Sequence, residues 1–93
     1  MNKEEARQLL ETTVRELRAR SRSELEQLLD APEVSTVQGR SGVTYQIEKE
    51  AVWDDRKGHD LRIMVLIDDG GWRALSPMAE SFIVAPDGSF VGE

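Results

Sequence analysis

The stretch that most constrains the fold is residues 61–69, LRIMVLIDD, which form the most apolar run in the chain. Glycines stand on both sides of it, with Gly58 before the run and Gly70 and Gly71 after it. A short run rich in Leu, Ile and Val and bounded by turn residues is typical of a buried β-strand. The sequence therefore predicts a central strand whose faces the rest of the chain has to cover.

Residues 56–58 predict a tight hairpin with glycine at the left-handed position, which joins the central strand to a long strand over 43–55. Pairing Asp55 with His59 places the apolar residues of both strands on one face, as a half-buried sheet requires. The predicted pairs are Trp53 with Leu61, Ala51 with Ile63, and Ile47 with Ile67. Lys49 falls on the same face, so we expect it to extend past the sheet edge or to mark a bulge.

Three more turn signals follow the central strand. The Asp-Gly pair at 69–70 is typical of a type I′ hairpin turn. A Ser-Pro pair at 76–77 favours a helical turn over 77–80. Residues 86–88 predict a tight turn after a strand over 81–85. The pairs that these turns predict are Ile67 with Trp72, Val65 with Ala74, and Val84 with Phe90.

Residues 2–30 contain no glycine or proline and are rich in good helix formers. Apolar residues follow helical spacing along one stripe, which residues 20–23 interrupt. The stripe consists of Ala6, Leu9, Leu10, Thr13, Val14 and Leu17, and then of Leu25, Leu28 and Leu29. Ser21 and Ser23 are each followed three residues later by glutamate, which fits a capping box. A helix broken near Ser21-Ser23 is predicted, with one continuous helix as the alternative, and Pro32 ends the element.

Residues 34–38 predict a first short strand, and residues 39–42 predict a turn into the long second strand. The fold class is therefore α+β: an N-terminal helix, broken or continuous, on one face of an antiparallel β-meander of about four to five strands. We expect a single domain over 1–93, with a helical part at 1–31 and an antiparallel sheet at 33–93.

Composition excludes several classes of function. The chain has no cysteine, so disulfides, thiolate metal sites and cysteine nucleophiles are excluded. A net charge of −6 argues against binding to nucleic acid or to anionic lipid. No apolar run is long enough to span a bilayer, and residues 1–5 do not resemble a secretory signal, so we expect a cytoplasmic protein. No cofactor motif is recognisable, and binding of a small molecule stays open.

Four residues at the predicted end of the first hairpin could carry chemistry. Asp54, Asp55, Asp60 and His59 could hold a divalent metal ion, although aspartate is also a residue that turns favour. His59 with a neighbouring aspartate could act as a base, but no nucleophile motif accompanies it, so we favour a non-catalytic protein. Three arginines, Arg15, Arg18 and Arg22, share one helical face and form a further candidate, an anion or RNA site.

Another set of residues points to a binding surface. In the predicted register, apolar side chains face away from the helix and are flanked by charges, which is typical of a partner surface. The apolar residues are Val52, Met64, Leu66 and Leu75, and the flanking residues include Arg62 and Arg73. The alternative is that the helix or the C-terminal segment covers them. We therefore predict a protein-interaction module, either a homodimer or an immunity-type inhibitor of a toxin. The alternative function is a small-ligand or divalent-metal domain that uses residues 54–60.

Two segments near the C-terminus, IDDGGWR at 67–73 and SFIVAPDGSF at 81–90, carry a resemblance. They are similar to the end of a group of short bacterial domains of unknown function, and the similarity extends over residues 43–93. The resemblance implies a small α+β bacterial domain. It implies no catalytic or binding residue.

Overall fold

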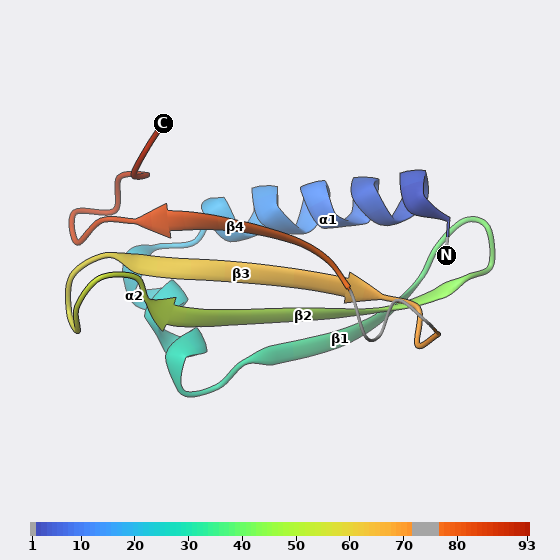
Figure 1. The fold of residues 1–93 in the computed structure, drawn as a ribbon, viewed down its shortest axis with the longest axis horizontal. Helices are drawn as coiled ribbons and strands as arrows, with labels where there is room; N and C mark the ends of the chain where they lie inside the picture. Colours follow the sequence, from blue (N-terminus) through green and yellow to red (C-terminus); the bar gives the residue numbers. More distant parts are fainter. Residues whose placement is uncertain (1, 72–76) are drawn as a thin grey trace.

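A computed structural model describes residues 2–71 and 77–93 of the chain. The fold is α+β, as predicted: the described residues form N-terminal helices packed on a four-stranded antiparallel sheet of order β1-β2-β3-β4 (Figure 1). The helical elements are α1 (Lys3–Arg18), α2 (Arg22–Glu26) and the 3-10 turn η1 (Gln27–Leu29). The strands are β1 (Glu33–Gln38), β2 (Thr44–Trp53), β3 (Leu61–Asp68) and β4 (Met78–Val84).

The N-terminal helix is broken where the sequence predicts a break. Asn2 caps α1, since its side chain accepts a hydrogen bond of 3.1 Å from the backbone N–H of Glu5. Ser21 caps α2 through a complete capping box with Glu24. Ser21 has an extended backbone (φ −68°, ψ 159°), whereas a helix requires a negative ψ. The chain therefore changes direction at Ser21, and α2 does not continue α1.

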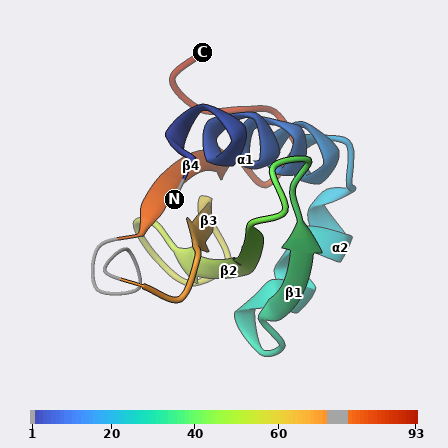
Figure 2. The ribbon, with the colours of Figure 1, turned by 90° about the vertical axis from the view of Figure 1, so that its right-hand side faces the viewer.

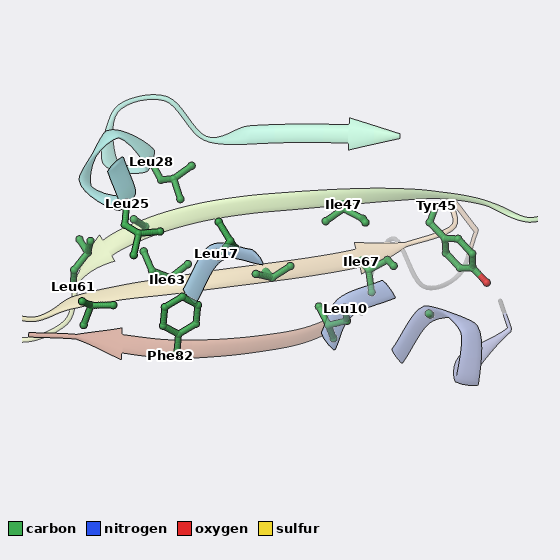
Figure 3. Close-up of a cluster of buried hydrophobic side chains, with 14 residues drawn as sticks. Leu10, Leu17, Leu25, Leu28, Tyr45, Ile47, Leu61, Ile63, Ile67 and Phe82 are labelled. Carbon is green, nitrogen blue, oxygen red and sulfur yellow. The ribbon is translucent and has the colours of Figure 1, made fainter. Parts of the chain in front are cut away.

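The sheet is curved around α1 (Figure 2). α1 packs on β3 and β4, η1 packs on β2, and α2 lies on the side of β1. The core between helices and sheet is made of aliphatic side chains with a few aromatic ones (Figure 3). Its buried members are Ala6, Leu10, Leu17, Leu25, Leu28, Tyr45, Ile47, Ala51, Leu61, Ile63, Val65, Ile67, Phe82 and Val84.

The predicted register between β2 and β3 is confirmed. Trp53 pairs with Leu61, Ala51 with Ile63, and Ile47 with Ile67. The ladder runs without a bulge through Lys49, which stands opposite Val65. The bulge alternative is therefore wrong: the Lys49 side chain extends toward the neighbouring strand β1, where its Nζ lies 3.8 Å from Oε1 of Glu33.

The predictions for residues 69–80 are wrong where the structure tests them. Met78 pairs with Ile67 and Glu80 with Val65, which excludes a two-residue turn at 69–70. Residues 78–80 belong to β4, so the predicted helical turn over 77–80 does not form. Trp72 and Ala74, the predicted partners, lie outside the described residues. The last turn is correct, because Val84 pairs with Phe90.

Candidate interaction surface on the outer face of the sheet

The two faces of β3 differ in burial. Leu61, Ile63, Val65 and Ile67 point toward the helices, and each is 0% exposed. The alternate residues Arg62, Met64, Leu66 and Asp68 point to the opposite side, here called the outer face, and are partly exposed. The neighbouring Val52 of β2 is 43% exposed on that face. Of the predicted interaction residues, the structure therefore brings together Val52, Met64, Leu66 and Arg62, while Leu75 and Arg73 lie outside the described residues.

A shallow hollow of about 250 Å³ lies on the outer face next to β4. This outer hollow is lined by Met64 and Leu66 of β3 and by Ala79, Glu80 and Ser81 of β4. Its floor is apolar because Met64 and Leu66 project from the central part of β3 beside the small side chains of β4. A concave apolar surface of this size fits one or two side chains of a binding partner.

The charges around the outer hollow are mainly negative. Glu48 stands opposite Leu66 and Glu50 opposite Met64, and neither carboxylate forms an ion pair with another described residue. Arg62 carries a positive charge nearby. Its Nη2 lies 2.7 Å from Oδ1 of Asp54, so its charge is locally compensated.

Arg62 also donates a hydrogen bond of 3.2 Å from Nη1 to Oγ of Ser81. It therefore links β3 to β4 across the outer face and to Asp54 at the end of β2. The predicted metal residue Asp54 is consequently engaged with Arg62, and it is not grouped with the other three candidates.

Those three, Asp55, His59 and Asp60, do come together at the hairpin end. One ligand atom of each lies within 4.8 Å of the other two. Nδ1 of His59 is 2.6 Å from Oδ2 of Asp55, and Oδ1 of Asp55 accepts the backbone N–H of Arg56 at 2.7 Å. Burial raises the pKa of Asp55, but the hydrogen bonds from Arg56, His59 and Asp60 outweigh it and lower the pKa to about 2. The aspartate thus stabilises the hairpin loop as an anion.

The predicted anion site on the arginine face is not assembled. Arg18 forms hydrogen bonds with the Glu93 carboxylate, one of them 2.8 Å long, and its guanidinium lies 4.0 Å from the centroid of Phe90. Arg22 donates hydrogen bonds to the carbonyl oxygens of Val84 (2.9 Å) and His59 (2.7 Å). Two of the three guanidinium groups therefore serve to hold the fold together.

Ala79, Glu80 and Ser81 are the residues of this surface that the sequence did not indicate. The Ser-Pro pair at 76–77 favoured a helical turn, and Glu80 breaks the apolar alternation that Phe82 and Val84 begin. A signal was present in that alternation. Extending it backward from Phe82 would have predicted a longer edge strand with one charged position.

Comparison with protein-family models, with curated protein sequences and with solved structures gave no match to this chain. The resemblance to short bacterial domains therefore stays a prediction. Among the described residues, no helix combines the length and the apolar character needed to cross a membrane.

Proposed function

We propose that this chain is a protein-interaction module whose outer sheet face binds a protein partner. The observation that carries the proposal is the outer hollow: Met64 and Leu66 remain partly exposed in it, although their neighbours on β3 are fully buried. An apolar hollow bordered by charged groups is the arrangement that partner-binding surfaces share. A bacterial source and a cytoplasmic location stay predictions that accompany this proposal.

Two kinds of partner are considered: a second copy of this chain, or a different protein that this chain inhibits or recruits. Sedimentation velocity over a range of concentrations separates them, because self-association makes the sedimentation coefficient of the pure chain rise with concentration. The same measurement on Leu66→Lys then tests the surface itself, since a charge in the centre of the hollow is costly to bury against a partner.

The matched control is Gln46→Lys, which adds the same charge to an exposed position on the outer face away from the hollow. We expect Leu66→Lys to abolish dimer formation, or co-purification of one identified partner from the source cell, and Gln46→Lys to preserve it. Binding that survives Leu66→Lys, or that both variants abolish equally, would contradict the proposal.

A divalent metal ion at the hairpin end is a second candidate function. It is favoured by the convergence of one imidazole nitrogen and two carboxylates, a donor set that suits Zn²⁺. Addition of Zn²⁺ should raise the melting temperature of the native chain but not of Asp55→Asn, because a ligand that binds the folded state stabilises it. No shift with Zn²⁺, Mg²⁺ or Ca²⁺ would eliminate this candidate.

A further inference from the structure

β4 is an edge strand, because it pairs with β3 on one side and with no other named strand on its second side. Residues 89–91 occupy only the end of that second side. The N–H of Val91 donates to the carbonyl of Ile83 at 2.9 Å, and the N–H of Ala85 donates to the carbonyl of Ser89 at 2.8 Å. The chain's own residues thus already form a short added strand on this edge.

The remaining part of this edge, here called the open edge, has no backbone partner among the residues that the structure describes. In an antiparallel strand, the N–H and C=O of one residue point to the same side, and successive residues alternate. Since the carbonyl of Ile83 points away from β3, the backbone groups of Ser81 and Ala79 also point away from it. Residues 79–81 are exposed, and no backbone group of another described residue pairs with this edge there.

The open edge adjoins the outer hollow, since Ala79 and Ser81 line it. A strand added to β4 would place alternate side chains on the two faces of the sheet. Its residues on the outer face would lie beside the hollow, and its residue on the other face would stand opposite Glu80. Strand addition draws its affinity from backbone hydrogen bonds and its specificity from pockets for alternate side chains. This edge offers both, together with the charge of Glu80.

A second copy of the chain does not suit this edge. The two-fold antiparallel pairing that uses only free backbone groups is centred on Glu80, because Pro77 lacks an N–H and the Ile83 carbonyl is already bonded. That register sets Glu80 of each copy directly opposite the other, about 5 Å apart at Cβ. Facing carboxylates repel, and a net charge of −6 on each chain adds to the repulsion.

We propose that the open edge of β4 binds an extended basic segment of a different protein as an added strand. A lysine or arginine of that segment pairs with Glu80, and its apolar neighbours occupy the outer hollow. This inference rests on the proposed function, because the hollow belongs to the proposed partner surface. It goes further in naming the backbone groups and the charge that recognise the partner.

The test uses the full chain labelled with ¹⁵N and two short blocked peptides, one alternating valine with lysine and one alternating valine with glutamate. We expect the lysine peptide to cause saturable shifts of the amide signals of residues 79–81. The glutamate peptide should bind at least about tenfold more weakly. Equal binding of the two peptides, no binding, or shifts elsewhere on the molecule would overturn the inference.

Two variants test the edge and the charge separately. Ala79→Pro removes an N–H that faces the open side, so the β3 ladder is retained while peptide binding is lost; Ala79→Ser is the matched control that keeps the N–H. Glu80→Lys changes an exposed side chain and should reverse the preference, so that the glutamate peptide binds and the lysine peptide does not. Unchanged preference in a folded Glu80→Lys variant would contradict the inference even if Ala79→Pro does not fold.

Leu66→Lys distinguishes this inference from the proposed function. If Leu66→Lys loses its protein partner while Ala79→Pro retains it, the outer face is the binding surface and the edge inference fails. If the peptide shifts depend on Ala79 and Glu80 while partner binding is indifferent to Leu66, strand addition at the edge stands, but the occupation of the outer hollow and the proposed function of the outer face both fail.

Discussion

Both faces of the sheet carry apolar side chains of β3, but the two sets differ in burial. On the helix side, Leu61, Ile63, Val65 and Ile67 are fully buried, and α1 packs on this face of the strand. On the outer face, Met64 and Leu66 are only partly buried, and the carboxylates of Glu48 and Glu50 opposite them form no ion pair with another described residue. The comparison shows that alternation along one strand divides its apolar residues into a set buried in the core and a set that stays partly exposed on the outer face.

The largest expected difference between the two faces is in stability. Leu17→Ala removes a fully buried side chain of α1 and should lower the free energy of unfolding by about 2–5 kcal/mol. Leu66→Ala on the outer face should cost less than about 1.5 kcal/mol, because its side chain is already partly solvated. Urea denaturation of both variants measures the difference. Equal destabilisation would mean that the outer face also belongs to the core.

A substitution of Arg22 tests how much the contact of α2 with the hairpin end contributes to stability. Its guanidinium donates to the carbonyl oxygens of Val84 and His59 and lies 5.6 Å from the centroid of Trp53. Arg22→Ala leaves both carbonyls without this donor and should cost about 2 kcal/mol. The control Arg22→Lys keeps the charge but lacks the planar guanidinium whose two Nη atoms each donate to one carbonyl, so its urea midpoint should lie between those of the native chain and Arg22→Ala. An Arg22→Ala midpoint equal to the native one would contradict this role.

A smaller effect is expected at the helix break. Ser21→Ala removes the side-chain cap of α2 and should lower the free energy of unfolding by about 1 kcal/mol. Ser23→Ala is the matched control, because the Glu24 backbone N–H donates its capping hydrogen bond to Oγ of Ser21. Urea denaturation should rank Ser21→Ala below Ser23→Ala. The reverse order would show that the Ser21 cap contributes little to the stability of the fold.

The smallest expected effect depends on pH. The pKa of Asp55 falls from 3.8 to about 2 on folding, so its contribution to stability is fully present above pH 3.8 and is lost as the pH falls toward 2. Asp55→Asn lacks this contribution at every pH. The gap in urea midpoint between the native chain and Asp55→Asn should therefore narrow as the pH is lowered through this range. A gap that stays constant down to about pH 2 would show that the charge of Asp55 is irrelevant.

The division of β3 into a buried face and an outer face could be predicted from the sequence, because the turn residues and the apolar alternation indicated the same register. The glycine of the 56–58 loop adopts the expected left-handed backbone (Gly58, φ 84°), and this single turn fixed the register of β2 against β3. Once the register was fixed, the orientation of Met64 and Leu66 followed from alternation alone. The helix break followed in the same way from the serine-glutamate spacing.

The edge of the surface could not be predicted in the same way. The Asp-Gly pair at 69–70 is a strong hairpin signal, but each aspartate of Asp68-Asp69 instead accepts a backbone N–H two residues on, from Gly70 and Gly71. The pairing of β3 with β4 is decided by non-local packing of Phe82 and Val84 under α1. Short-range turn preference does not contain that information, so the extent of β4 and the open edge emerged only from the structure.

The most direct test of the contrast between the two faces compares two neighbouring substitutions on β3. Val65→Lys places a charge in the fully buried core, and Leu66→Lys places the same charge on the outer face. We predict that urea denaturation finds Leu66→Lys within about 1 kcal/mol of the native free energy of unfolding, while Val65→Lys shows no cooperative unfolding transition. A Leu66→Lys variant as unstable as Val65→Lys, or a stable Val65→Lys variant, would contradict the assignment of one face to folding and the other to binding.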